Sequence, residues 1–492
     1  MQAMTAASLD ELRAELAPAA TISSDGLSVA DPAAFRGTLT DQLVRDAVFH
    51  TDPAFRDACR WVIWAASQAL GCGSASIQDL YAARGRGEIP PTAFTVPAIN
   101  VRAAAYLTAR AVFTVARQRQ VGALVFEIAK TEMAYTDQRP DEYATVILAA
   151  ALREGWSGPV FIQGDHFQFN ATRWRADPDA ELAGLRDLTR EAVGAGFLNI
   201  DIDASTLVDL DQPSIPDQQR VNADQTADLT RLIRSLEPPG VTISIGGEIG
   251  EVGKTNSTEA ELRAYLAEYR AALADDADEA DGNPGISKVS IQTGTSHGGV
   301  ALPDGSIAPV ALDFDTLRRL STVAREEFAL AGCVQHGAST LPEEAFGHFP
   351  ASGCTEIHLA TGFQNILYDG GGLPEDLKAE MMAWCIANCA DERKPGETDG
   401  QFLYKTRKKA LGPFKAALWS IGPEAEATIS AHLASRLALL FERLGVDGSR
   451  DLVDRYVQVP ELPRPIPAGL GGAAAAQVRA GDDTFADDGS GE

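Results

Sequence analysis

The sequence predicts an α/β protein built as a closed (β/α)8 (TIM) barrel with N-terminal and C-terminal helical extensions. Eight short apolar segments alternate with amphipathic helical segments between residues 94 and 359, a pattern typical of βα units and a parallel sheet. Unusual polar residues follow the C-terminal end of nearly every apolar segment. An open sheet would gather them at one switch point, whereas a closed barrel places its active site at all these strand ends.

The order of the segments sets the predicted boundaries. Residues 1–92 form a helical extension without recognisable chemistry, and residues 93–369 form the catalytic barrel. The predicted strands span residues 94–100, 122–128, 158–164, 197–203, 241–248, 286–292, 332–335 and 355–359. The helices between them span residues 101–117, 141–154, 180–195, 223–236, 259–274, 315–329 and 342–346.

Residues 370–461 form a C-terminal helical region, with helices expected at 375–389 and 423–444. The second helix repeats apolar residues at helical spacing, which predicts a packing or subunit surface. We therefore expect a homodimer or larger homo-oligomer formed through these helices. Residues 462–492 are rich in Pro, Ala and Gly and then acidic, and we expect a disordered tail.

Composition excludes several classes of partner. The formal net charge of −27 argues against binding nucleic acid or anionic membranes, because phosphate contacts need clustered Lys and Arg. No apolar run has the length needed to span a bilayer, and the first residues lack the pattern of a secretory signal. The six cysteines show no metal-type spacing, so we expect reduced thiols and a cytoplasmic protein.

Three histidines end predicted strands and form the strongest chemical signal. They are His166, His297 and His336, and the last two are each followed directly by glycine. Three imidazoles delivered by three strand ends are the donor set of a catalytic zinc site that leaves one position open for substrate. Asp165 precedes the first of them and faces substrate as a proton donor or acceptor if a metal is bound. Without a metal it could be a helix N-cap.

Further polar residues end neighbouring strands. Asp203 and Glu248 lie where they could orient a metal-bound histidine or act as alternative ligands. His358, on the eighth strand, faces substrate or is a satisfied structural histidine. The small-residue turns at Gly337, Ser339 and Thr361 precede helices, in the loops where such barrels often bind phosphate.

The barrel region resembles the class II (zinc-dependent) fructose-bisphosphate aldolase family, including the tagatose-bisphosphate aldolases. The matching segments occur in the family's order and spacing, and are Val96-Pro-Ala-Ile-Asn100, Gly164-Asp-His166, Ile202-Asp-Ala-Ser205, Gly247-Glu-Ile-Gly250, Gly294-Thr-Ser-His-Gly298 and Gln335-His-Gly-Ala-Ser339. The stretch 196–210 is also similar to the non-catalytic partner subunit of bacterial tagatose-bisphosphate aldolases.

The resemblance implies one Zn²⁺ per chain, held by the three histidines, and allows for a monovalent cation as a second ion. It implies that Asp165 is the acid/base on the aldehyde-derived oxygen, and that Asp203 and Glu248 are carboxylates near the metal. The substrate and phosphate contacts that we carry over or infer are Asn100, Lys254, Gly298, Gly337, Ser339 and Thr361.

The sequence departs from the family at three places, one of which is the absence of the family's lysine after His297-Gly298-Gly299. His358 stands where the family has an asparagine that holds the enediolate, and Ala360 removes a carboxylate. The loop after the fifth strand differs too, which obscures the carbon base, and we take Glu259, the last residue of that stretch, as a catalytic candidate together with His358.

The leading hypothesis is a zinc-dependent aldolase acting on a phosphorylated ketose through an enediolate. One alternative is a non-catalytic barrel subunit that supports a partner enzyme. Another is a metal-dependent lyase or epimerase for an unphosphorylated sugar or acid.

Overall fold

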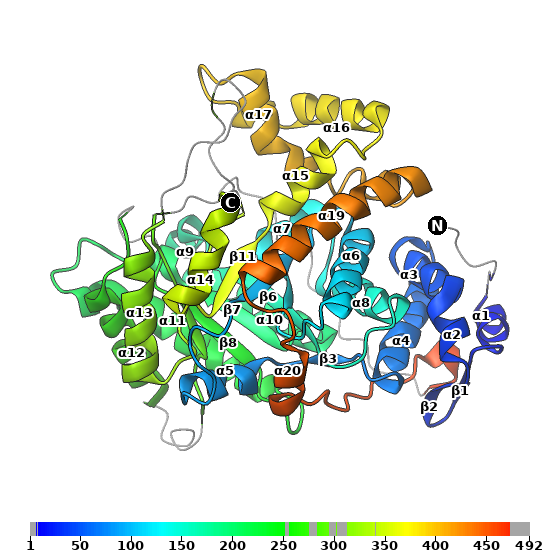
Figure 1. The fold of residues 1–492 in the computed structure, drawn as a ribbon, viewed down its shortest axis with the longest axis horizontal. Helices are drawn as coiled ribbons and strands as arrows, with labels where there is room; N and C mark the ends of the chain where they lie inside the picture. Colours follow the sequence, from blue (N-terminus) through cyan, green and yellow to red (C-terminus); the bar gives the residue numbers. More distant parts are fainter. Residues whose placement is uncertain are drawn as a thin grey trace.

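The computed structural model contains a closed barrel of eight parallel strands, as the sequence predicts (Figure 1). It describes residues 6, 8–250, 255–274, 283–294, 302, 312–339 and 341–472. The barrel strands are β4 (Val96–Asn100), β5 (Val125–Ala129), β6 (Val160–Gln168), β7 (Asn199–Asp203), β8 (Ser244–Glu248), β9 (Lys288–Ile291), β10 (Cys333–Gln335) and β11 (Glu356–Leu359). Each strand pairs in parallel with the next, and β11 pairs with β4 to close the ring.

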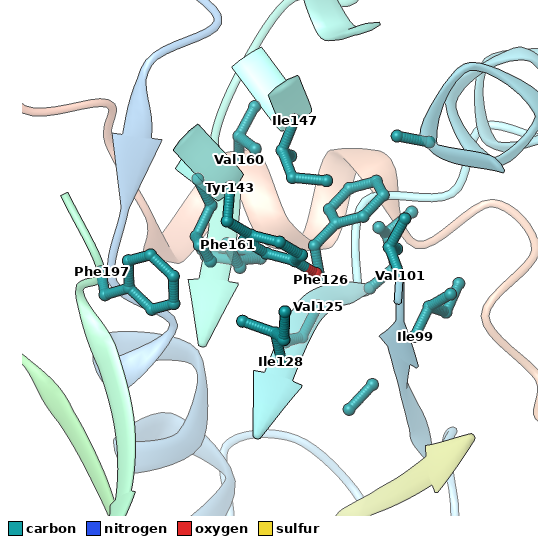
Figure 2. Packing of buried hydrophobic residues seen from close by; sticks show 14 of the residues in the cluster. Ile99, Val101, Val125, Phe126, Ile128, Tyr143, Ile147, Val160, Phe161 and Phe197 are labelled. Atoms are coloured by element: carbon teal, nitrogen blue, oxygen red, sulfur yellow. The ribbon is translucent and has the colours of Figure 1, made fainter. Parts of the chain in front are cut away.

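Successive residues of each strand point alternately out of and into the barrel. The outward residues are apolar and pack against the surrounding helices. Figure 2 shows this packing for Phe126 of β5 and Ile99 of β4, together with Tyr143 and Ile147 from helix α8. All four side chains are at most 1% exposed. Many of the inward residues are instead charged or polar, which supplies the chemistry described below.

Helices follow the strands and cover the outside of the barrel (Figure 1). They are α6 (Ala105–Gln118), α7 (Lys130–Thr136), α8 (Pro140–Arg153), α9 (Ala171–Ala176), α10 (Pro178–Ala195), α11 (Ile215–Leu236), α12 (Glu259–Ala274), α13 (Phe314–Phe328), α14 (His348–Ser352) and α15 (Thr361–Asp369), with short 3-10 turns at Ser205–Leu207 and Glu343–Gly347. Local signals set their ends. Helix α10 starts at the capping side chain of Asp177, which accepts a hydrogen bond from the Ala180 amide, and stops at Gly196 with φ of 97°.

The N-terminal region is less purely helical than the sequence predicts. It contains α1 (Leu9–Leu16), a hairpin of β1 (Ala20–Ser23) and β2 (Gly26–Val29), α2 (Pro32–Ala34), a π-helical turn (Phe35–Leu39), α3 (Thr40–Phe49), α4 (Pro53–Ala69), β3 (Ser74–Ala75) and α5 (Gln78–Gly85). Strand β3 pairs with the first residues of β6, so this region extends the barrel sheet.

The C-terminal region comprises α16 (Glu375–Asn388), a turn at Ala390–Glu392, α17 (Asp399–Thr406), a turn at Arg407–Ala410, α18 (Lys415–Leu418), α19 (Pro423–Arg443), α20 (Arg450–Tyr456) and a turn at Ala468–Leu470. The apolar stripe of α19 is buried within the same chain, and its members are Ile429, Leu433, Leu437 and Leu440. Helix α19 contacts α6 and α15. The stripe is therefore a packing surface within the chain. Because it presents no exposed apolar face, it does not support the oligomer predicted through these helices.

The first part of the predicted tail packs against the N-terminal region. The indole nitrogens of Trp61 and Trp64 donate to the carbonyls of Arg464 and Leu462, at 3.1 and 2.8 Å. The expectation of disorder from residue 462 onward is therefore wrong for residues 462–472, which pack on the N-terminal region. Residues 473–492 lie outside the described part, and there it stays an expectation. Among the described helices, none is both long enough and apolar enough to cross a membrane.

Candidate functional site

The C-terminal ends of six barrel strands bring polar side chains to one place. The contributing residues are His166 on β6, Asp203 on β7, Glu248 on β8, Ser290 on β9, His336 directly after β10 and His358 on β11. Most of these side chains are buried. Because all the strands are parallel and closed into a ring, residues that lie far apart in sequence meet at this mouth of the barrel.

A bulge in β6 aims His166 into the mouth. The pairing of β6 with β7 shifts by one residue between Gly164 and Phe167, and His166 adopts φ of 39°, in the left-handed region. A non-glycine residue in that region carries strain that is typical of functional sites. Gly164 is required here, because a Cβ at this position would clash with the ring of Phe167. The bulge lets Asp165 and His166 both face the barrel interior.

The two described histidines of the predicted zinc site each have one ring nitrogen held by an oxygen. His166 Nδ1 lies 3.1 Å from Asp203 Oδ2 and 3.2 Å from Glu248 Oε2. His336 Nε2 lies 2.9 Å from Ser290 Oγ. The remaining nitrogens, His166 Nε2 and His336 Nδ1, face each other at 2.7 Å. These two nitrogens are within hydrogen-bond distance of each other, and an oxygen that fixes the opposite ring nitrogen is also the arrangement seen in metal-binding histidines.

Asp203 is held as a carboxylate. Burial by itself would raise its pKa, but hydrogen bonds from His166, Ser205 and Gln168 outweigh that effect and lower the pKa. A charged carboxylate at this position orients His166 and raises its basicity as a ligand. Together with Glu248 it surrounds His166 with oxygens, so Asp203 and Glu248 lie where the sequence places them.

Asp165 and His358 form a second cluster immediately beside the histidine pair. His358 Nδ1 lies 3.0 Å from both Asp165 Oδ1 and Glu127 Oε2, while its Nε2 lies 2.8 Å from Glu356 Oε1. Burial would lower the pKa of His358, but Glu127 and Asp165 raise it well above its ordinary value. Both ring nitrogens lie within hydrogen-bond distance of carboxyl oxygens, so His358 pairs with Asp165 as an imidazolium.

Glu127, which the sequence analysis does not single out, shares this cluster. Burial and the neighbouring charge of Asp165 raise the pKa of Glu127 to about 8. The opposite holds for Asp165: burial would raise its pKa, yet His166 and His358 lower it to about 2. The two carboxyl groups that contact His358 thus differ in protonation. Asp165, which lies beside His166 and His336, is the charged one.

A charged layer lies inside the barrel beneath this cluster and is also absent from the sequence-based site. Lys288 Nζ donates to Gln163 Oε1 at 2.8 Å, to Asp201 Oδ2 at 2.9 Å and to Glu356. The Tyr81 hydroxyl, from α5, donates to the other Glu356 oxygen. The signal for this layer is the alternation within each strand, since the polar residues recur at every second position.

Glycine makes room for the charged layer. Gly246 of β8 points toward Asp201 and Lys288, and a Cβ there would overlap the Asp201 carboxylate and crowd Lys288. Burial would lower the pKa of Lys288, but Asp201 and Glu356 raise it, so the amine is an ammonium ion. The layer is therefore held by charge pairing across the barrel, not by apolar packing.

The predicted anion contacts lie at the same mouth, around the start of α15. Ser339 Oγ accepts a hydrogen bond from the Ala360 amide at 2.7 Å, and Gly337 takes φ of 68° just before it. Thr361 accepts a hydrogen bond from Arg102 at 3.1 Å. Asn100 ends β4 and donates to Glu132. Arg102, which the sequence analysis does not name, thus lies among the predicted substrate contacts.

Other predicted site residues are placed elsewhere or not described. His297, Gly298 and Lys254 lie outside the described residues, and their roles stay predictions. Glu259 begins α12 and pairs with Arg263 at 3.0 Å and with Arg319 at 3.8 Å. Those partners lie on α12 and α13, so these contacts do not bring Glu259 to the histidine cluster.

Comparison with known structures finds the same fold. A probable tagatose 6-phosphate kinase from Sinorhizobium meliloti 1021 matches with a TM-score of 0.51 and 17% identity, over 76% of this chain and 96% of that one. A fructuronate-tagaturonate epimerase, UxaE, from Cohnella laeviribosi matches with a TM-score of 0.50 and 10% identity, over 86% of this chain and 88% of that one. A fructose-bisphosphate aldolase from Campylobacter jejuni matches with a TM-score of 0.45 and 16% identity, over 78% of this chain and 99% of that one.

No curated protein matches the chain. The family model for fructose-bisphosphate aldolase class II, however, matches residues 91–407, which is more than half of the sequence and includes every barrel strand. The match agrees with the closed barrel and with a mouth whose His, Asp and Glu side chains could hold a metal ion. The chain therefore belongs to the class II fructose-bisphosphate aldolase family.

Proposed function

We propose that the protein is a metal-dependent aldolase that cleaves and forms a phosphorylated ketose resembling fructose bisphosphate. One observation carries this proposal: His166 Nε2 and His336 Nδ1 face each other at 2.7 Å while Asp203 and Ser290 hold the opposite nitrogens. This donor set suits Zn²⁺, and His297 would complete it. Family membership supports aldolase-type chemistry.

Each residue then has a defined task in cleavage. A Zn²⁺ held by His166, His336 and His297 would supply a Lewis acid for the negative charge that develops as the carbon–carbon bond breaks. The Asp165 carboxylate accepts the proton of the hydroxyl group on the carbon that becomes the aldehyde. The electrons of the breaking carbon–carbon bond pass to the enediolate, and in the condensation direction Asp165 returns the same proton. His358 keeps the Asp165 carboxylate in place through the 3.0 Å contact.

The buried lysine supports metal chemistry over Schiff-base chemistry. A Schiff base requires an unprotonated amine that is free to attack a carbonyl. Lys288 is instead fully enclosed and paired with Asp201 and Glu356, and its pKa is raised. Its position at the start of β9 also separates it from the C-terminal strand ends where the histidines meet.

An activity assay combined with elemental analysis tests the proposal. Triose phosphate release would be measured on fructose and tagatose bisphosphates and on their monophosphates, with and without a chelator. We expect one zinc per chain and release that the chelator abolishes. Asp165→Asn should keep the zinc and lose release, whereas Asp228→Asn, on the outer surface of α11, should keep both. Release that persists after complete metal removal would overturn the proposal.

A second candidate is a metal-dependent epimerase acting on a sugar acid through the same enediolate. Ala360 in place of the family's carboxylate favours it. Zinc without triose phosphate release, but with epimerised sugar acid, would establish this candidate. Neither zinc nor any turnover would favour the non-catalytic subunit instead.

A further inference from the structure

Arg102 is a buried cation at the mouth of the barrel, two residues after the end of β4. Its side chain is 6% exposed. Its Nη1 donates to Glu132 at 2.7 Å and to the Tyr135 hydroxyl at 3.0 Å, and its Nη2 donates to Thr361 at 3.1 Å. Its Nε has no hydrogen-bond partner among the described residues. A buried guanidinium with an unsatisfied N–H is costly, unless a ligand completes it.

The unsatisfied edge of the guanidinium faces the start of α15. Nε–H and the neighbouring Nη2–H share one edge of the planar group, and Nη2 points at Thr361, the first residue of that helix. Ala360 makes no side-chain cap to α15, and its own amide donates to Ser339 Oγ at 2.7 Å; the amides of the first turn can serve a further acceptor. Arg102 and this helix end therefore meet at Thr361.

Glu132 does not use up the charge of Arg102 on this edge. The carboxylate binds the opposite nitrogen, Nη1, with Oε1, while its Oε2 accepts from Asn100 and from the Ala129 amide at 2.9 Å. Glu132 thus fixes the orientation of the guanidinium through Nη1 and leaves Nε–H, next to the Nη2 that donates to Thr361, for another anion. Two parallel N–H donors match the oxygens of a phosphate or a carboxylate.

We propose that Arg102 binds the anionic end of the substrate through its Nε and Nη2 edge, beside Thr361 and Ser339, and so determines specificity for a charged sugar. The anion is either a phosphate ester or a sugar carboxylate, because both present paired oxygens to this edge. This inference rests on the proposed function only in assigning the anion to a sugar-derived substrate.

Binding of small anions to the intact protein tests the proposal without turnover. Isothermal titration calorimetry would measure inorganic phosphate and acetate on the wild type, Arg102→Lys and Arg407→Lys. Lysine keeps the positive charge beside Glu132 but removes the Nε–Nη2 edge. Arg407 is the matched control: it is equally buried, also has an unpartnered Nε, and pairs with Asp369 at the other end of α15.

We expect Arg102→Lys to weaken anion binding by about tenfold or more, the range of a lost charge-assisted hydrogen bond, and Arg407→Lys to leave it unchanged. A preference for phosphate would identify a phosphate ester, and a preference for acetate would identify a carboxylate. Equal binding to the wild type and Arg102→Lys, or no binding of either anion to the wild type, would overturn the inference.

Thr361→Val provides a second test if Arg102→Lys does not fold, and it should weaken the same anion several-fold. Wild-type anion binding in Thr361→Val would then overturn the inference. The outcome is separate from that of the proposed function, because Arg102-dependent phosphate binding without triose phosphate release keeps this inference and removes the aldolase. Triose phosphate release, with phosphate affinity and KM unchanged in Arg102→Lys, would keep the aldolase and remove this inference.

Discussion

Two layers of charged side chains lie inside one barrel, and they differ in what balances their charge. In the interior layer, Lys288 neutralises Asp201 and Glu356 with a cation that belongs to the protein. At the mouth, Asp203 and Glu248 approach His166, whose other nitrogen faces His336. The same residue types therefore build a structural network in one layer and a candidate metal site in the other, only a few residues apart along the strands.

The comparison shows that burial of charge does not by itself mark a functional site. A buried ion pair that includes its own cation is complete, and removing one partner leaves an uncompensated charge. A cluster of imidazoles and carboxylates whose nitrogens converge offers ligands to a cation from outside. Variants of the two layers should consequently affect different measurements, stability for the interior and metal binding for the mouth.

The largest effect is expected from Lys288→Met. The substitution leaves Asp201 and Glu356 buried without their cation, so the free energy of unfolding should fall by about 3–5 kcal/mol. Chemical denaturation measures the change. Arg186→Met, which breaks the partly exposed pair with Asp228, is the control and should change stability little. A similarly small loss in Lys288→Met would mean that Lys288 does not hold the interior layer together.

His336→Ala should abolish tight metal binding while leaving stability of the metal-free protein nearly intact. Loss of a direct ligand should weaken affinity by more than about 100-fold, the upper range for loss of a residue that only supports a ligand. Metal content after dialysis provides the measurement. His348→Ala removes a histidine that packs on Phe314 outside the mouth and should retain full metal content. Equal metal content in both variants would refute the assignment of His336.

Asp203→Asn separates orientation of a ligand from ligation. The amide cannot supply the carboxylate charge that holds His166 Nδ1, so metal affinity should fall by about 10–100-fold without being lost. Competition with a fluorescent chelator resolves a change of this size. The variant sharpens the comparison because its effect on unfolding should be much smaller than that of Lys288→Met. Unchanged affinity would remove Asp203 from the metal site.

Glu127→Gln tests a residue between the two layers through the pH dependence of stability. The pKa of Glu127 is raised from 4.5 to about 8, so the folded protein keeps a proton that the unfolded chain releases above pH 4.5. The stability that this bound proton contributes is therefore fully present below pH 4.5. It is lost as the pH rises toward 8, at no more than about 1.4 kcal/mol per pH unit. Denaturation of the metal-free protein from pH 5 to 8 should show this loss in the wild type. The slope should be shallower in Glu127→Gln, and parallel pH profiles would contradict the raised pKa.

The sequence allows the barrel to be predicted strand by strand, because each apolar segment is short and each helix after it has a clear period. His166 and His336 were predictable for the same reason, since His166 lies near the end of β6 and His336 directly follows β10. The layer around Lys288 and Glu356 was missed because single polar residues inside apolar segments look like interruptions until the strands are known to face a common interior. The bulge at Asp165 and His166 could not be predicted either, since it depends on the register between β6 and β7.

Arg102 illustrates the same limit at the mouth. Its neighbours come from two other elements, Glu132 and Tyr135 from α7 and Thr361 from α15. The closure of β11 onto β4 brings Thr361 to the other two. Motif spacing therefore reveals residues whose chemistry is local to a strand end. It does not reveal residues whose role depends on partners from several strands.

We propose that the mouth of the barrel holds a metal ion and that the interior layer does not. Anomalous X-ray diffraction from crystals of the purified protein, recorded on both sides of the zinc absorption edge, tests it most directly. We expect one anomalous peak, between His166 Nε2 and His336 Nδ1, and none beside Lys288. A peak among Asp201, Glu356 and His358, or no peak in protein grown with zinc, would contradict it.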